Sequence, residues 1–360
     1  MKNRREFIKT VAGVAAGTVL GGGALVEAAA RAPQAGAPAA RREVRVGSKR
    51  VKVVDVHAHA TFPEVGDVVK GTPLERNARG GGRAMGPDRI AEMDKRGIDV
   101  QALDINAFWW YEADRDLATK IVQVHDEGLS KWCTAHSDRF VAFTSPALQF
   151  PDLAAEQVEH AVKQLGMKGV AIGGHVKGEP LSMAKYDPFW AKVQELGVIV
   201  FMHPNGAENV AKPDGFAGAG DLGNIIGNPL ETILFFSHLI YDGTLDKFPG
   251  LKICGAHGGG YLPSYLGRTD VACDVRPNAK CVNKMHPREY LHNQIMADSM
   301  VFTPEGVRHL VAEMGAGQVV YGTDIPLVWP DTIDSILQAE IPDAQKEMVL
   351  GGNLVKLLKL

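Results

Sequence analysis

Short apolar runs alternate with longer amphipathic stretches along most of the chain. The amphipathic stretches, such as 117–137 and 153–165, place apolar residues every three or four positions, as helices that cover a core do. This alternation is typical of parallel strands joined by crossover helices. The predicted strands are 51–57, 99–105, 140–147, 168–174, 198–203, 251–256, 295–299 and 318–323. Eight such strands close a barrel, so we predict an α/β fold of the distorted (β/α)8 TIM-barrel type.

Four of the apolar runs lead into a histidine or an aspartate. His57 and His59 end the first run, and His203, His257 and Asp324 end three later ones. Side chains two positions apart in a strand share a face, and the carboxyl ends of barrel strands meet at one end of the barrel. A single histidine at such a position is most often a packed or hydrogen-bonded residue. Four coincidences at the same end of the runs favour a shared site.

The residue types predict a metal centre. We assign His57, His59, His203 and Asp324 as ligands of one divalent metal ion, and we count Asp324 among the catalytic residues as well. Three imidazole nitrogens and one carboxylate suit zinc, with manganese as an alternative, and they leave a position for water. Such a metal-bound water ionises near neutral pH.

His257 remains after the ligands are assigned. It lies in the segment Ala256-His257-Gly258-Gly259-Gly260, where the glycines allow a close approach of backbone and substrate. A histidine beside a metal ion is held neutral by the charge of the ion, so it can accept a proton. We therefore predict that His257 is the catalytic base. A fifth ligand, or a hydrogen-bond partner of a ligand, is the alternative.

Length and charge limit the classes of function. The chain has 360 residues, enough for a barrel as a single domain, and its net charge is −3 with acidic and basic residues interspersed. No block of Lys and Arg residues lies outside the N-terminus, so the sequence does not favour a nucleic acid as a partner. The expected partner is a small molecule.

The N-terminal region predicts export. Arg4-Arg5, followed by Phe7 and Lys9, resembles a twin-arginine signal, and a Gly- and Ala-rich apolar segment leads to small residues near Ala30. We expect residues 1–42 to be signal and linker, 43–360 to be the barrel domain, and the mature protein to be periplasmic without a membrane segment. A retained anchor is the alternative, but glycines interrupt the apolar segment and it is short for a membrane span.

The cysteines do not suggest a disulfide framework in a chain of this length. Cys254 lies within an apolar run and is expected to be a small core residue. Cys273 and Cys281 could pair in an oxidising compartment, but we expect them to be free.

Several segments together resemble one known family, the aminocarboxymuconate-semialdehyde decarboxylases of the amidohydrolase superfamily. The segments that carry the resemblance are Asp55-Val56-His57-Ala58-His59, Ile172-Gly173-Gly174-His175-Val176, Phe201-Met202-His203-Pro204, Lys247-Phe248-Pro249-Gly250-Leu251-Lys252, Ala256-His257-Gly258-Gly259-Gly260 and Tyr321-Gly322-Thr323-Asp324-Ile325-Pro326. The resemblance implies a distorted barrel with one metal at the four positions above and a catalytic histidine at His257. It also implies that Arg268 reaches the active site of a neighbouring subunit to hold a substrate carboxylate, and hence a homodimer.

Further substrate contacts are predicted at the rim of the barrel. They come from Trp109, His175 and one loop arginine, for which we name Arg83, with Arg76 and Arg79 as alternatives. The fourth strand lacks the lysine that bridges two metals in other amidohydrolases, so we expect a mononuclear site. The loop after His203 also differs from the decarboxylase.

These features lead to three hypotheses about function. The first is a metal-dependent decarboxylase of an unsaturated or aromatic carboxylic acid, with the metal-bound water and the His257 base. The second is a metal-dependent hydrolase of a lactone, an ester or a carbon–carbon bond on the same scaffold. The third is a non-catalytic periplasmic binding protein, which gives His257 no evident role.

Overall fold

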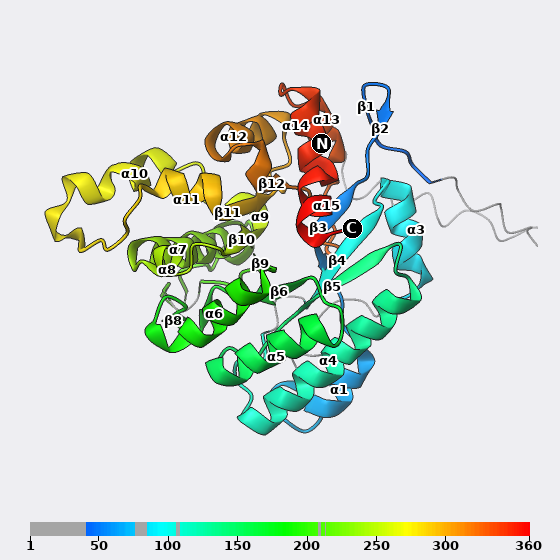
Figure 1. Cartoon of the computed structure of the whole chain (residues 1–360), viewed down its shortest axis with the longest axis horizontal. Coiled ribbons are helices and arrows are strands. Elements are labelled where there is room, and N and C mark those ends of the chain that lie inside the picture. Colours follow the sequence, from blue (N-terminus) through cyan, green and yellow to red (C-terminus); the bar gives the residue numbers. More distant parts are fainter. Residues whose placement is uncertain (1–40, 76–84, 106–108, 208–209, 213) are drawn as a thin grey trace, which may run out of the picture. The chain divides into compact units, whose positions relative to one another are not determined.

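A closed parallel barrel forms the centre of the molecule. The computed structural model describes residues 41–75, 85–105, 109–207, 210–212 and 214–360, and all of them belong to one compact unit. The barrel strands are β3 (Val54–His59), β4 (Val100–Asp104), β5 (Phe140–Thr144), β6 (Gly169–Ile172), β9 (Ile199–Met202), β10 (Lys252–Gly255), β11 (Ile295–Asp298) and β12 (Val319–Val320). They pair in parallel in this order, which confirms the predicted TIM barrel and all eight predicted strands (Figure 1).

The barrel closes between its first and last strands. The Val56 N–H donates to the Tyr321 carbonyl at 3.0 Å, and the His59 N–H donates to the Ile325 carbonyl at 2.7 Å. The Asp324 N–H donates to the His57 carbonyl at 2.8 Å. Closure therefore places Asp324 directly beside the strand that carries His57 and His59.

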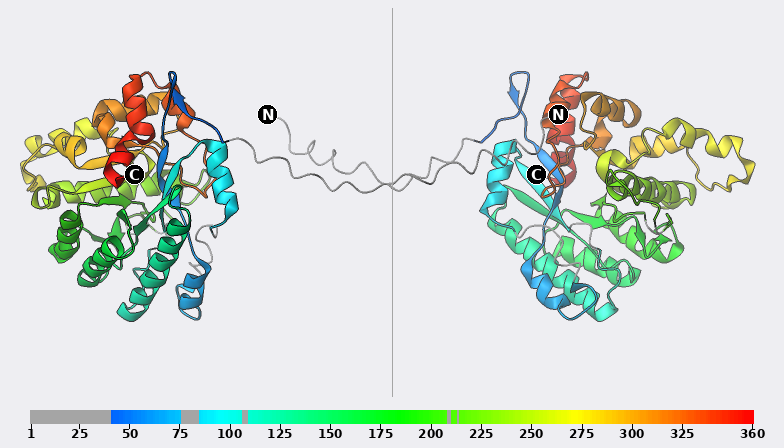
Figure 2. Two further views of the ribbon diagram at one scale, coloured as in Figure 1. Left: turned by 45° about the vertical axis from the view of Figure 1, so that its right-hand side comes forward. Right: turned by 180° about the vertical axis from the view of Figure 1, so that it is seen from behind.

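The helices lie outside the barrel and cover its strands (Figure 2). The α-helices are α1 (Pro63–Val69), α3 (Pro87–Arg96), α4 (Arg115–Ala135), α5 (Pro151–Lys163), α6 (Asp187–Leu196), α7 (Asn228–Tyr241), α8 (Thr244–Lys247), α9 (Ala256–Gly259), α10 (Leu266–Val275), α11 (Pro287–Asn293), α12 (Pro304–Met314), α13 (Ile333–Gln338), α14 (Asp343–Glu347) and α15 (Asn353–Leu358). The two stretches predicted to be helical correspond to α4 and α5. None of the helices in the described ranges is both long and apolar enough to span a bilayer.

Short elements complete the chain. Two antiparallel hairpins pair β1 (Arg45–Val46) with β2 (Lys49–Arg50) and β7 (His175–Val176) with β8 (Glu179–Pro180). The 3-10 and π-helical turns are η2 (Ala184–Tyr186), η3 (Gly223–Gly227), η4 (Pro277–Ala279), η5 (Ala316–Gln318) and η6 (Met348–Gly352).

Local sequence signals fix where the helices begin and end. The Asp114 side chain caps α4 by accepting a hydrogen bond from the Leu117 N–H at 2.9 Å. Pro87 opens α3, and Gly97 ends it with φ of 85°, a conformation that favours glycine. Large side chains such as Trp190 and Phe201 are fully buried in the core that the helices and strands share.

One expectation about the cysteines was wrong. Cys273 at the end of α10 and Cys281 form a disulfide across eight residues of sequence. The pairing arises because η4 turns the chain back after α10, which sequence spacing alone did not reveal. Cys254 is fully buried in β10, as expected.

Candidate metal centre

The two histidines of the first barrel strand point to the same side. His57 and His59 are both fully buried in β3, and their Nε2 atoms lie 3.2 Å apart. The alternation of side chains along the strand brings the two rings together, as the sequence predicts. These atoms form one half of the site.

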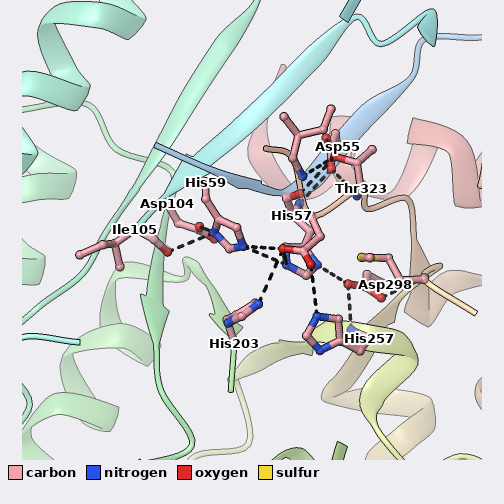
Figure 3. Close-up of polar contacts among 12 residues, drawn as sticks. Asp55, His57, His59, Asp104, Ile105, His203, His257, Asp298 and Thr323 are labelled. Carbon is pink, nitrogen blue, oxygen red and sulfur yellow. Dashed lines mark hydrogen bonds and ion pairs between the residues drawn. The ribbon is translucent and has the colours of Figure 1, made fainter. Parts of the chain in front are cut away.

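Three further strands supply the other half. Asp324 follows β12, and its Oδ1 lies 2.9 Å from the His59 Nε2 and 3.2 Å from the His57 Nε2. His203 follows β9 and places its Nε2 4.0 Å from the same oxygen. His257 follows β10 and places its Nε2 3.8 Å from the Asp324 Oδ2. Figure 3 shows the four histidines converging on one point.

These groups have the geometry of a metal centre. The potential ligand atoms of His57, His203, His257 and Asp324 all lie within 4.8 Å of one another. His59 joins them through its direct contacts with His57 and Asp324. The predicted ligands and the predicted base are therefore all gathered at the carboxyl ends of the strands, where TIM-barrel enzymes carry their active sites.

The outer nitrogens of two predicted ligand histidines are held by buried carboxylates. The His57 Nδ1 donates to the Asp298 Oδ2 at 2.7 Å, and the His59 Nδ1 donates to the Asp104 Oδ1 at 2.5 Å. Such hydrogen bonds fix the ring orientation and the tautomer of a metal-binding histidine. The sequence analysis missed both aspartates, although each of them stands at the carboxyl end of a predicted strand.

The tautomers explain why a cation fits between these groups. Because each Nδ1 carries the hydrogen, the Nε2 atom of a neutral His57 or His59 presents a lone pair to Asp324. Lone pairs and a carboxylate at 2.9–3.2 Å repel one another unless a positive charge lies among them. Protons or a divalent metal can supply this charge, and the donor set of nitrogens with one carboxylate suits a metal.

Without a metal, protons take over this role. Burial lowers the pKa of His57, but the neighbouring Asp324 and Asp298 carboxylates outweigh burial and raise it well above its ordinary value. Burial and the charges of the other histidines lower the pKa of His203. Burial raises the pKa of Asp324, but His57 and His257 outweigh it, and the net pKa is lowered. Metal binding would therefore displace protons from this cluster.

The backbone is strained at two of these residues. His257 and Asp324 have φ of 55° and 61°, in the left-handed region that side chains other than glycine rarely adopt. Asp298 stabilises the turn at His257 by accepting the His257 N–H at 3.0 Å and the Gly258 N–H at 2.8 Å. A Cβ atom on Gly258 would lie 2.6 Å from Val301, so glycine is required there.

A buried carboxyl group also ties the ligand strands together. Asp55 accepts hydrogen bonds from the Thr323 hydroxyl at 2.6 Å, the Gln101 amide at 2.8 Å and the His57 N–H at 3.0 Å. Burial raises its pKa to about 6, although these hydrogen bonds oppose the rise. Asp55 thus connects β3 with the segment that leads to Asp324.

Comparison with known proteins decides the family. Residues 54–360 match the family model described as "Amidohydrolase". The chain belongs to the amidohydrolase family. A 2-amino-3-carboxymuconate-6-semialdehyde decarboxylase from Dictyostelium discoideum is 32% identical to this amidohydrolase over 285 residues, covering 76% of this chain and 77% of that protein.

Two further relatives are decarboxylases. A gamma-resorcylate decarboxylase from Polaromonas sp. is 29% identical over 284 residues, covering 76% of this amidohydrolase and 86% of that protein. The crystal structure of a dihydroxybenzoic acid decarboxylase from Polaromonas sp., with bound manganese and the inhibitor 2-nitroresorcinol, superimposes with a TM-score of 0.74 at 25% identity. That match covers 86% of this chain and 97% of the other.

The predicted substrate contacts of the amidohydrolase lie in different surroundings. Trp109 is 6% exposed, stacks on Tyr111 and fills the space above Gly173. His175 is half-buried in β7, and its Nδ1 accepts the Gly178 N–H at 3.0 Å. In the described ranges no hydrogen bond, ion pair or ring contact joins Trp109 or His175 to the five clustered side chains, and their substrate roles remain predictions.

Of the two arginines predicted to contact substrate, the structure describes Arg268 but not Arg83. Arg268 is exposed on α10, which projects away from the barrel in Figures 1 and 2. The structure brings it to no residue of the cluster among those described. Arg83 and its alternatives Arg76 and Arg79 lie outside the described residues.

Proposed function

We propose that this amidohydrolase is a metal-dependent decarboxylase of an unsaturated or aromatic carboxylic acid. The observation that carries the proposal is the convergence of three histidines and Asp324 beside a fourth histidine, His257. The related decarboxylases named above support the reaction class. The expected substrate is a small-molecule carboxylate.

His57, His59, His203 and Asp324 would hold one divalent ion, for which zinc is our first proposal and manganese our second. The manganese in the related Polaromonas structure supports a divalent ion. When bound, the ion supplies a positive charge that orients the substrate and stabilises negative charge in the transition state. Asp298 and Asp104 keep the two imidazoles of β3 aimed inward.

His257 moves the proton. Decarboxylation replaces a carboxylate by hydrogen at the same carbon, so one proton enters as carbon dioxide leaves. The His257 imidazole borders the ligand atoms and keeps partial access to solvent, with 17% of its side chain exposed. The Asp298 hydrogen bond to its backbone fixes its place, so the ring can transfer a proton to or from the substrate.

We also propose a homodimer in which Arg268 holds a carboxylate of the substrate bound to the other subunit. A guanidinium binds a carboxylate through two parallel hydrogen bonds. The exposure of Arg268 on α10 supports a role outside its own barrel.

Export to the periplasm through the twin-arginine signal in residues 1–42 is a further proposal. The Cys273–Cys281 disulfide supports it, because disulfides persist in oxidising compartments. Cell fractionation of the full chain and of an Arg4→Lys, Arg5→Lys variant tests it. The proposal requires that only the unaltered chain reaches the periplasm.

The decisive experiment compares two substrate panels with the purified, metal-loaded protein. Carbon dioxide release from hydroxybenzoates or carboxymuconates supports the decarboxylase. Turnover of lactones or esters alone favours the hydrolase, and turnover of neither panel favours the binding protein. His257→Asn should abolish turnover while the metal content stays near one per chain. Loss of the metal in this variant would contradict the role of His257 in proton transfer.

A further inference from the structure

A buried carboxylate outside the metal cluster joins two of the loops that surround it. Glu231 lies in the first turn of α7 and is only 3% exposed. One of its carboxylate oxygens accepts the Gly174 N–H at 2.8 Å. The other accepts the N–H groups of Asn205 at 2.9 Å and Gly206 at 2.6 Å. Glu231 therefore bridges the segments that follow β6 and β9.

The three N–H groups that Glu231 accepts lie just beyond the last hydrogen bonds of the sheet. The ladder between β6 and β9 continues to the hydrogen bond from the His203 N–H to the Ile172 carbonyl at 2.9 Å. In the described part of the protein no further backbone hydrogen bond joins the two segments, and Pro204 has no N–H to contribute. Buried backbone N–H groups need acceptors, and the Glu231 carboxylate supplies them for the segments after β6 and after β9.

His203 differs from the other predicted ligands in how its ring is held. The outer nitrogens of His57 and His59 donate to Asp298 and Asp104. Neither ring nitrogen of His203 has a hydrogen-bond partner in the described part of the chain, although the residue is 3% exposed. The His203 ring packs edge-on against the rings of the three other histidines of the cluster, but no hydrogen bond fixes it. Its position therefore depends on this packing and on its backbone, which Glu231 holds two and three residues further on.

The end of β6 leaves just enough space for this carboxylate. A Cβ atom on Gly174 would lie 2.7 Å from the Glu231 Oε1 and 2.6 Å from the Met202 Cε. Backbone φ at Gly174 is not in the left-handed region, so close approach is the reason for glycine here. Gly174 and Glu231 are thus matched to each other.

We propose that Glu231 is a positioning residue for the metal centre, which fixes the ligand His203 through the backbone of the loop after β9. Asp298 and Asp104 act on ligand rings, whereas Glu231 acts on the main chain that carries the ligand. The inference rests on the metal-binding part of the proposed function. It does not depend on which substrate the protein uses.

Two substitutions test the contact between Glu231 and Gly174, one at each residue. Glu231→Gln keeps the size of the side chain, but its NH2 group must face one of the N–H donors, so at least one hydrogen bond is lost. Gly174→Ala leaves the carboxylate intact and displaces it. Asp99→Asn is the matched control, because Asp99 is also buried and accepts the Val53 N–H at 2.7 Å, but it lies just before β4 at the opposite end of the barrel.

The readout is the dissociation constant for Zn²⁺, measured by competition with a chromophoric chelator, together with the absorption spectrum of the Co²⁺-loaded protein. We expect Glu231→Gln and Gly174→Ala to weaken Zn²⁺ binding at least fivefold and to alter the Co²⁺ bands, while Asp99→Asn stays within twofold of the unaltered protein.

Two results overturn the inference while leaving the proposed function intact. One is Zn²⁺ binding within twofold in both test variants, and the other is an equal loss in the Asp99→Asn control, which would indicate general destabilisation. Absence of both Zn²⁺ and Mn²⁺ binding by the unaltered protein overturns both the inference and the proposed function. A melting temperature recorded for each variant shows that folded proteins are compared.

Discussion

Asp298 offers the sharpest test of how the metal centre is held. Its Oδ2 accepts the His57 Nδ1–H at 2.7 Å and the His257 N–H at 3.0 Å, and its Oδ1 accepts the N–H groups of Gly258 at 2.8 Å and Met300 at 3.1 Å. Asp298 itself is fully buried, so water cannot replace these hydrogen bonds easily. The substitution Asp298→Asn keeps the shape of the side chain but replaces one acceptor oxygen by a donor.

The magnitude follows from these contacts. An asparagine can accept only two of the four hydrogens in either orientation of its amide. Hydrogen bonds to a charged group contribute about 1.5–3 kcal/mol each, so losing two costs about 3–6 kcal/mol before relaxation. Loss of the negative charge also weakens the alignment of the His57 ring, and substitutions of such partners lower metal affinity by about 10- to 100-fold.

Chelator competition for Zn²⁺ measures the affinity, and urea unfolding of the metal-free protein measures the stability. Asp246→Asn is the control, because Asp246 accepts two hydrogen bonds, from the Lys284 N–H and the Tyr290 hydroxyl, both at 2.8 Å, in α8 before β10. A folded Asp298→Asn variant that binds Zn²⁺ as tightly as the unaltered protein would refute the reasoning.

Three further predictions concern the metal, the dimer and the disulfide. Removal of the metal by dialysis against a chelator should abolish turnover and lower the melting temperature. The reason is that a ligand at about 1,000 times its Kd stabilises the folded protein by about 4 kcal/mol. Full activity without metal would contradict this prediction. Arg268→Ala and His257→Asn should each be inactive alone but active when their subunits are mixed, because one site of the mixed dimer contains both residues; a mixture without activity contradicts the shared site. Cys273→Ser should destabilise the oxidised protein by about 2 kcal/mol in urea unfolding, and no change would indicate that the disulfide is absent in solution.

The fold and the cluster of candidate metal ligands were predictable because both depend on local sequence patterns. Strands buried on both faces are nearly continuous apolar runs, so β3 and its seven counterparts stood out from the helical stretches. The ends of the strands were less certain. The first strand was predicted to span 51–57, whereas β3 continues to His59, because hydrogen bonds to the neighbouring strands define the boundary.

The supporting residues were harder to predict. Asp104 and Asp298 stand at the carboxyl ends of predicted strands, and applying the rule that found the ligands to every strand would have identified them. Glu231 carries no such signal. It lies in a helix and contacts residues that are 57, 26 and 25 positions away in the sequence, so only the folded chain reveals its role. The pairing of Cys273 with Cys281 likewise depends on a turn that the spacing did not indicate.

X-ray absorption at the metal edge of the purified protein, combined with elemental analysis, tests the central claim most directly. The account predicts one divalent ion per chain, bound by three imidazoles and one carboxylate. In a His203→Ala variant, the scattering contribution of one of the three imidazoles should be lost. An absent or substoichiometric ion, or one bound through sulfur, would contradict the account.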